Sequence, residues 1–305
     1  MARRKKGKDI NGILLLDKPF GSSSNAALQK VRYLFDAKKA GHTGSLDPLA
    51  TGVLPICFGE ASKVTAYLLE SDKRYTCTAQ LGVTTTTGDK EGEILQTRDI
   101  TPFDQAAIEN ILETFRGEIK QIPPMYSALK HNGQPLYKLA RQGIDIKRKA
   151  RDVTIHELKL IKFDKETLTL DIHCSKGTYI RTLAQDIGEA LSCGAHLSML
   201  RRTHVSPFNC EKLYSIEEIE TLSKQNGLLD ILLPIDSALP NLPHITLNNA
   251  QANQIKNGLK VNIEKDELAK APLIRLYLEN GEFIGIGRYS SSDKTLAPKR
   301  LMRTN

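Results

Sequence analysis

The chain has 305 residues, of which 40% are hydrophobic and 26% are charged; this composition is typical of a soluble globular protein and argues against a largely disordered one. Its five dispersed cysteines form no CxxC pair, which argues against a disulfide framework or a zinc ribbon, and no apolar run is long enough for a membrane span or a signal peptide. We therefore expect a reduced cytoplasmic protein. The formal charge of +8 favours a polyanionic partner, although many basic proteins bind no nucleic acid.

The first 115 residues are predicted to alternate between strands, helices and loops. In chain order these are a buried strand at 11–19, a serine-capped helix at 22–35, a loop at 41–55, a helix at 60–70, an alternating strand at 74–83, a turn or hairpin loop at 84–93 and a helix at 101–115. Two strands in this region are thus separated by helices and by one long loop.

Residues 121–208 are predicted to add two helical segments and three strands. In chain order these are an irregular segment at 121–143 that becomes helical near its end, strands at 152–163 and 167–175 around a charged turn, a helix at 178–195 and a strand at 196–208. The strands come in adjacent pairs and not in strict βαβ alternation. This order favours an α+β fold with a mixed or antiparallel sheet.

A change of composition divides the chain near its C-terminus. Three prolines fall within residues 234–243, and the rest of the chain has the pattern of one helix and short strands, with a tight hairpin turn at Asn280-Gly281. We predict three parts, namely a flexible basic tail at 1–10, a large domain at 11–240 and a small β-rich domain at 241–305.

One loop has the composition of a constrained site. Residues 41–55, GHTGSLDPLATGVLP, contain a single carboxylate, Asp47. Pro48 favours an extended backbone at Asp47, and the glycines allow tight turns and close approach of a ligand. Such a loop can present one carboxylate rigidly to a substrate. A structural turn, in which the aspartate bonds its own backbone, is the commoner use of this pattern.

Motifs of several common enzyme classes are absent. The chain has no GxxxxGK[ST], GxGxxG, HExxH or GxSxG motif. Asp47 has no second acid in its loop, which argues against a paired-carboxylate glycosidase and against an aspartate-based phosphotransferase that binds Mg²⁺. These patterns predict a reaction that needs neither a nucleotide cofactor nor a metal.

Several segments, taken together, resemble one known family. LLLDKPFGSSS and GHTGSLDPLATGVLP are similar to the two N-terminal signatures of the TruB family of tRNA pseudouridine synthases. Further similar segments follow in family order: RYTCTAQLGVTTTTGDKEG, PPMYSALKHNGQPLYKLARQG, SKGTYIRTLAQDIGEALSCGAHLSMLRRTHVSPF and LLPIDSAL. They cover most of residues 11–238, and the remainder resembles the small RNA-binding, PUA-like domain of bacterial members. Departures such as Ser45 and Ser206, where the family usually has threonine and glycine, concern loop geometry and not the reaction.

The resemblance implies an isomerase that converts the uridine at position 55, in the T loop of tRNA, to pseudouridine without a cofactor. The N1–C1′ bond breaks, the uracil turns, and C5 bonds to C1′, after the base has been flipped out of the folded loop into a pocket. The implied fold is a mixed-sheet α+β catalytic domain followed by a PUA-like domain. The implied partner is the T stem-loop of tRNA, with no membrane and no obligate protein partner, and we expect a monomer.

The same resemblance assigns the central residues of the site. Asp47 matches the catalytic aspartate, and attack on the sugar, attack on the base and removal of a ribose proton all stay open as its role. Tyr75 and Leu200 match the residues that contact the flipped uracil, and Tyr75 is also expected to remove the C5 proton. Arg181, close to Tyr179 in GTYIRTL, matches the basic residue that pairs with the aspartate and keeps it ionised.

Six further residues match positions around the site: His42, Lys18, Pro19, Asp89, Lys130 and Arg141. His42 is expected to help order the T loop and flip the base, whereas Lys18 and Pro19 close the first strand beside the site. Asp89 matches a family acid in a predicted turn. Lys130 and Arg141 are predicted phosphate contacts, which position RNA without reading its sequence.

A non-catalytic tRNA-binding or tRNA-folding protein that uses the same groove is the alternative function. A pure binder has no need to keep the acid, both tyrosines and the arginine, so their presence favours the enzyme. The two functions differ in whether pseudouridine is formed and whether it is lost when Asp47 is replaced while tRNA still binds.

Overall fold

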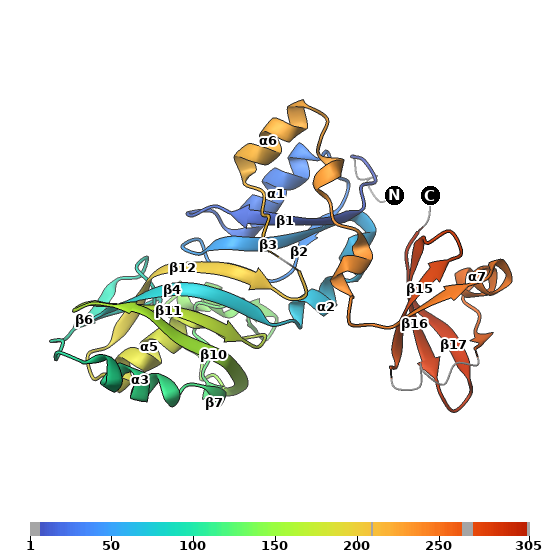
Figure 1. The fold of residues 1–305 in the computed structure, drawn as a ribbon. Coiled ribbons are helices and arrows are strands. Elements are labelled where there is room, and N and C mark those ends of the chain that lie inside the picture. The colour runs from blue at the N-terminus through green and yellow to red at the C-terminus, as the bar shows by residue number, and fades with distance from the viewer. Residues whose placement is uncertain (1–6, 209, 264–270, 304–305) are drawn as a thin grey trace.

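The computed structural model describes residues 7–208, 210–263 and 271–303. A mixed eight-stranded sheet with helices forms the larger body of the molecule, and a five-stranded sheet forms the smaller, C-terminal one (Figure 1). The α+β fold class with a small β-rich domain is therefore confirmed. Among the described residues, no helix combines the length and the apolar character that a membrane span requires.

The large sheet has the strand order β1-β3-β12-β4-β11-β10-β7, and β2 pairs with β3 at one side. Its strands are β1 (Gly12–Lys18), β2 (Ala40–His42), β3 (Thr51–Phe58), β4 (Lys73–Leu81), β7 (Gly117–Gln121), β10 (Arg151–Phe163), β11 (Thr167–Cys174) and β12 (Ala195–Val205). Only the β3–β12 pair is parallel. The central strand β12 thus joins the N-terminal strands to the β4–β11–β10–β7 half of the sheet.

Helices and small hairpins surround this sheet. They are α1 (Ser24–Leu34), the 3-10 helix η1 (Gly59–Lys63), α2 (Thr65–Leu69), the hairpin β5 (Val83–Thr85) and β6 (Ile94–Thr97), α3 (Gln105–Glu113), the hairpin β8 (Lys130–His131) and β9 (Gln134–Pro135), α4 (Leu136–Ala140), α5 (Ile180–Ala190), α6 (Ile216–Lys224) and the 3-10 helices η2 (Leu229–Ile231) and η3 (Ile235–Ala238). In Figure 1, α3 and α5 lie against the β4–β10 half of the sheet, whereas α1 and α6 lie together beside β1.

Several predicted elements differ from the observed ones. Both ends of the predicted loop at 41–55 are paired strands, so that only residues 43–50 are a loop. The predicted helix at 60–70 is divided into η1 and α2, and α3 begins after its cap Asp104. Neither β7 nor α6 was predicted, although Ser215 and Glu218 form a capping box at the start of α6. Pairing with neighbouring strands and packing on the sheet decide these elements more than local propensity does.

The small C-terminal sheet has the order β13-β15-β16-β17-β14. It comprises β13 (His244–Leu247), β14 (Val261–Asn262), β15 (Leu273–Leu278), β16 (Phe283–Ser290) and β17 (Thr295–Leu301), with helix α7 (Asn249–Lys256) packed on it. The hairpin predicted at Asn280-Gly281 joins β15 and β16, which confirms that turn. The domain boundary at residues 240–241 stays a prediction.

Buried side chains form three clusters. The largest lies between the large sheet and its helices, and another fills the small C-terminal domain. A third cluster joins side chains of β1, β3 and η1 to Ile286 and Met302 of the C-terminal domain. Residues 1–6 of the predicted tail lie outside the described residues, whereas Lys8 hydrogen-bonds to the backbone of Asp36 and Lys38.

Candidate active site

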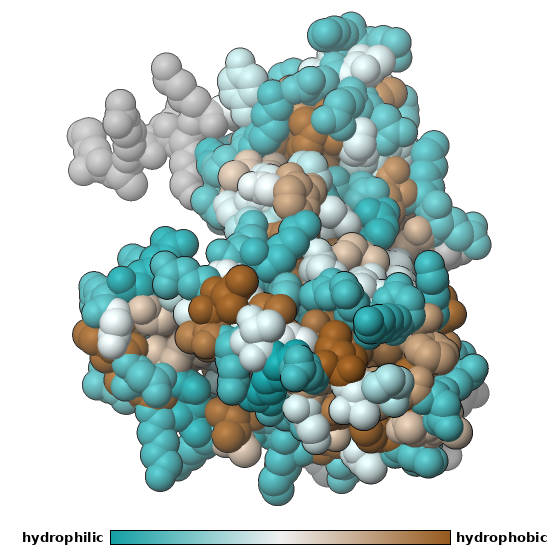
Figure 2. Space-filling view, turned by 90° about the vertical axis from the view of Figure 1, so that its left-hand side faces the viewer, coloured by the Kyte–Doolittle hydropathy of each residue, from teal (hydrophilic) through white to brown (hydrophobic). Residues whose placement is uncertain are grey.

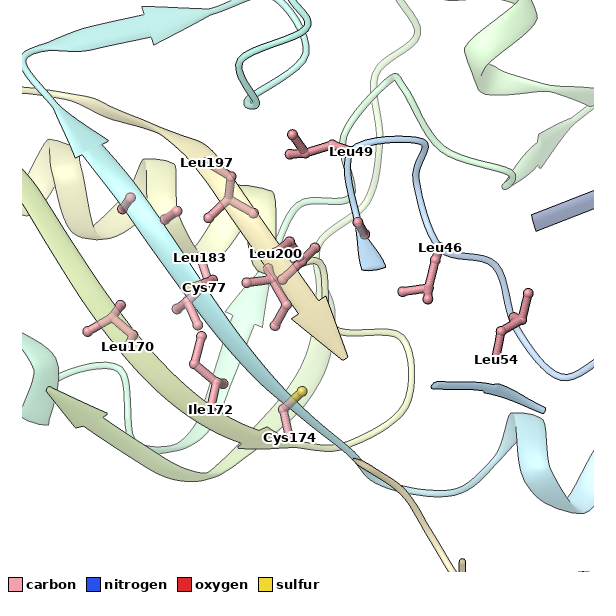
Figure 3. Packing of buried hydrophobic residues seen from close by; sticks show 14 of the residues in the cluster. Leu46, Leu49, Leu54, Cys77, Leu170, Ile172, Cys174, Leu183, Leu197 and Leu200 are labelled. Carbon is pink, nitrogen blue, oxygen red and sulfur yellow. The ribbon is translucent and has the colours of Figure 1, made fainter. Parts of the chain in front are cut away.

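The loop that carries Asp47 is fastened to helix α1 and to the core. The Ser24 hydroxyl accepts a hydrogen bond from Leu46 N at 2.7 Å and donates to Leu46 O at 3.0 Å, and Gly21 N donates to Pro48 O at 2.9 Å. Figure 3 shows Leu46 and Leu49 of the loop in the same buried cluster as strand β12. The backbone on both sides of Asp47 is therefore held in place before any substrate binds.

Lys18, at the end of β1, ties that strand to the same loop. Its side chain is fully buried, and Nζ donates to Pro19 O at 2.8 Å, to Ser22 O at 2.5 Å and to Pro48 O at 3.5 Å. Burial lowers the pKa of Lys18 to about 8, and the charge of Asp47 opposes that change. Lys18 and Pro19 thus connect the end of β1 to the loop and hold the loop in place.

Arg181, in the first turn of α5, is the ion-pair partner of Asp47. Its Nε lies 2.9 Å from Asp47 Oδ2, while Nη1 donates to Thr87 O and Nη2 to Tyr126 O, each at 2.7 Å. The Arg181 side chain is 5% exposed, whereas that of Asp47 is 41% exposed. A fixed cation therefore orients the carboxylate from within the protein, and the carboxylate keeps surface that a ligand can reach.

The charge state of Asp47 is set by opposing effects. Burial raises the pKa of Asp47, Arg181 lowers it, and the nearby Asp89 raises it further. Asp89 Oδ2 lies 3.8 Å from Arg181 Nε, and its Oδ1 accepts hydrogen bonds from Thr87 Oγ1 at 2.6 Å and from Glu91 N at 3.1 Å. Asp89 is thus both a turn residue and a second acid beside the guanidinium.

Tyr75 and Leu200 lie on neighbouring strands, β4 and β12. The register pairs Tyr75 with Arg202 and Cys77 with Leu200, which places these side chains on one face of the sheet. Leu200 belongs to the main buried cluster, and Tyr75 packs against that cluster. Burial raises the pKa of Tyr75, and the charge of Arg202 acts in the opposite direction.

Tyr179 and His42 are the remaining residues that the family resemblance placed at the site. Tyr179 precedes α5, and the buried Gln121 clamps its backbone, accepting from Tyr179 N at 2.8 Å and donating to Tyr179 O at 3.1 Å. Burial raises the pKa of Tyr179, whereas burial and Arg202 lower that of His42. Nδ1 of His42 is buried and has no partner among the described residues.

Lys130 and Arg141 lie apart from this cluster and are exposed. Lys130 is in β8, and Arg141 follows α4 with its guanidinium 5.6 Å from the centre of the Tyr137 ring. The segment that carries them begins at Tyr126, whose carbonyl oxygen accepts a hydrogen bond from Arg181.

The face of the molecule in Figure 2 is mostly hydrophilic, with exposed apolar residues in separate patches.

The sequence did not reveal three polar residues that shape this site. Ser24, Gln121 and Arg202 are all buried, and each bonds to a backbone or side chain of the site. A polar residue within an apolar strand or helix pattern is the only signal that the sequence offers for such a role. No group of three or more His, Cys, Asp or Glu side chains within the described ranges has an arrangement suited to a metal ion.

Three family models match consecutive parts of the chain. They are the TruB family pseudouridylate synthase N-terminal domain at residues 32–180, the tRNA pseudouridylate synthase B C-terminal domain at 181–240 and the pseudouridine synthase II TruB C-terminal model at 243–302.

Curated relatives and solved structures are similar over nearly the whole chain. The tRNA pseudouridine synthase B of Shewanella denitrificans is 52% identical over 99% of this chain and 97% of that protein, and the one of Pseudomonas fluorescens is 53% identical over 97% of each. A structure of an H/ACA RNP bound to a substrate RNA containing 2′-deoxyuridine has a TM-score of 0.72 at 20% identity, covering 100% of this chain and 92% of the other. A Cbf5-Nop10-Gar1 complex has a TM-score of 0.69 at 22% identity, covering 96% and 84%. At these identities the two structures show a shared fold.

Proposed function

Because the chain belongs to the TruB family of tRNA pseudouridine synthases, we propose that it isomerises the uridine at position 55 of the tRNA T loop, with Asp47 as the catalytic residue. The observation that carries the proposal is the Asp47–Arg181 pair, in which a buried guanidinium 2.9 Å away orients a carboxylate that is still 41% exposed. A structural turn residue needs no such partner.

The proposed reaction leaves the composition of the nucleotide unchanged. The N1–C1′ bond breaks, the uracil rotates, C5 bonds to C1′, a proton leaves C5 and N1 gains one. Asp47 has the reactive group for three routes, namely attack on C1′, attack on the base, or removal of a ribose proton. Each route needs an ionised carboxylate, which Arg181 favours electrostatically. No nucleotide cofactor or metal takes part in the proposed reaction.

Binding requires that the target base leaves its loop. We assign the uracil to a space between Asp47, Tyr75 and Leu200, with His42 helping to displace the base and Tyr179 lining the site. The cost of unstacking is offset by contacts in this pocket. Lys130 and Arg141 are proposed to contact phosphates, because both are exposed cations on a segment that begins at the site.

The proposed partner is tRNA alone, bound by a single chain whose C-terminal PUA-like domain adds affinity. One of the similar structures is an RNP with a substrate RNA and another is a complex of three proteins, but at about one-fifth identity they support the fold and not an assembly for this chain. A reducing, cytoplasmic location is part of the proposal, and all five cysteines are free in the structure.

The test uses an unmodified tRNA transcript, wild-type protein and the Asp47→Asn variant, with pseudouridine mapped by position and tRNA binding measured separately. We expect one pseudouridine at position 55 with the wild type, no product with the variant and similar binding by both. Binding without product by the wild type would instead indicate a non-catalytic tRNA-binding protein.

A further inference from the structure

Arg202 is a buried charged residue that the proposed reaction has not yet used. It lies on the central strand β12, is 2% exposed and is among the largest fully buried side chains. Nε donates to Val53 O at 2.8 Å, and Nη2 has no partner among the described residues. Nη1 lies beside the site loop, 3.9 Å from the point that a Cβ on Gly44 would occupy.

The charge of Arg202 is not neutralised by an acid. No carboxylate in the described part of the chain forms an ion pair with it, whereas its neighbours on β12 and α5, Arg201 and Arg181, pair with Asp17 and Asp47. Arg202 also lies near a second cation, Lys18, whose pKa its charge lowers. Burying an unpaired guanidinium costs stability, and an apolar side chain of similar shape would avoid that cost. A costly feature of this kind, beside a reactive site, indicates a functional role.

Tyr75 is the site residue that lies opposite Arg202 on the neighbouring strand. The two residues are opposite each other in the β4–β12 register, so their side chains lie on the same face of the sheet, and the charge of Arg202 opposes the rise in the pKa of Tyr75 that burial causes. The backbone of Arg202 is also fixed, because it pairs with Gly52 so closely that a Cβ on Gly52 would lie 2.1 Å from Arg202 O. A cation on a fixed backbone thus lies opposite the phenol that is expected to contact the base.

We propose that Arg202 is the positioning residue that holds Tyr75 as the acceptor of the C5 proton in the last step of the reaction. This inference rests on the proposed function. In the step, Tyr75 first loses its phenolic proton to solvent. The C5–H bond then breaks, its proton goes to the Tyr75 phenolate oxygen, and the electron pair restores the C5–C6 double bond of the uracil. N1 takes up a proton from solvent, so that Tyr75 ends as the phenol and no oxidant or co-reactant is needed. The guanidinium stabilises the phenolate and fixes its direction.

The test separates proton removal from the earlier steps by changing the substrate. A tRNA transcript with 5-fluorouridine at the target has no C5 hydrogen, so its rearrangement ends once C5 has bonded to C1′. Arg202→Met removes the charge and keeps a similar shape. We expect single-turnover pseudouridine formation from uridine to fall about 10- to 100-fold, the size of effect expected when a nearby opposite charge that favours the phenolate is lost. Rearrangement of 5-fluorouridine should keep the wild-type rate, and the melting temperature should be unchanged or higher.

Controls make the outcome decisive. Arg201→Met, on the same strand but paired with Asp17, should change neither rate selectively. Equal slowing of the uridine and 5-fluorouridine reactions by Arg202→Met, or unchanged rates for both, would overturn the inference and leave Arg202 a structural residue. If Arg202→Met does not fold, Arg202→Lys replaces it, with a smaller selective loss expected and equal slowing again counting against the inference. Absence of product from the wild type would overturn the proposed function instead.

Discussion

The ion pair between Asp47 and Arg181 links a half-buried carboxylate to a buried guanidinium. Arg181 is fixed by two backbone carbonyls in addition to Asp47, so its guanidinium cannot follow a displaced carboxylate. Asp47 is held from its other side, because Lys18 and Ser24 bind the adjoining loop backbone. Such positioning matters because proximity and orientation contribute much of an enzyme's rate enhancement.

The pKa of Asp47 gives a prediction for the dependence of activity on pH. Burial raises it, so the rate should fall on acidification at a pH above about 4, the ordinary value for an aspartate. Arg181 lowers this pKa, and its removal in Arg181→Met should therefore move the acid limb to higher pH. Single-turnover rates from pH 4.5 to 8 for wild type, Arg181→Met and the charge-conserving Arg181→Lys measure the shift. An acid limb that stays at one pH in all three proteins would contradict a role for Arg181 in keeping Asp47 ionised.

Close contact between α5 and β12 brings Arg181 and Leu200 into one site. Gly188, within α5, has no room for a side chain, since a Cβ there would lie 2.4 Å from Ala195 N. Helix and strand can therefore approach each other at backbone distance. The first turn of α5 is also held by Gln121 through Tyr179, which connects the helix to the edge strand β7.

The segment from β8 to α4 carries the two exposed cations that are proposed to contact RNA phosphates. Lys130→Ala and Arg141→Ala should each weaken tRNA binding several-fold and reduce the slope of log affinity against log salt by about 0.7 to 0.9 per lost contact. Binding titrations at a series of salt concentrations measure both effects. Lys224→Ala, in α6, removes a surface charge from another element and serves as the control. A slope equal to that of the wild type would show that neither cation contacts a phosphate.

The C-terminal domain is docked on the catalytic body and not merely tethered to it. Ile286 and Met302 belong to a buried cluster that includes side chains of β1 and β3. Lys63 Nζ donates to Leu301 O at 2.6 Å, and Tyr277 Oη donates to Asp236 Oδ2 at 2.6 Å. These contacts fix the orientation of the second domain relative to the active site.

Loosening this contact should affect RNA binding more than the reaction. Met302→Ala removes a nearly buried side chain from the shared cluster, a change that costs about 2 to 5 kcal/mol in protein cores. We expect weaker tRNA binding but an unchanged single-turnover rate once the enzyme is saturated. Truncation of an exposed apolar side chain to alanine, in Leu259→Ala, is the control. A lower rate at saturation would mean that the domain contact also shapes the active site.

Patterns and motifs in the sequence were sufficient to predict the fold class, most of the helices, the family, and strands β1, β4, β10, β11 and β12 of the large sheet. Alternating apolar residues specify β4, β10 and β11, since half-buried strands have a period of two. The loop around Asp47, with its glycines and Pro48, could be recognised because its motif is local and continuous. Matches of this kind depend only on neighbouring residues in the chain.

Apart from the Asp47–Arg181 pair, which the family resemblance implied, the contacts between side chains of the site follow from the packing of the folded chain. The partners of Asp47 come from distant segments, so no local pattern relates Arg181, Asp89 and Lys18 to one another. Arg202 has no local sign of its role, because its burial and its position opposite Tyr75 follow from the β4–β12 register and from the close pairing with Gly52. Such contacts are set by the packing of strands far apart in sequence, and a single sequence does not encode them in any local period or motif.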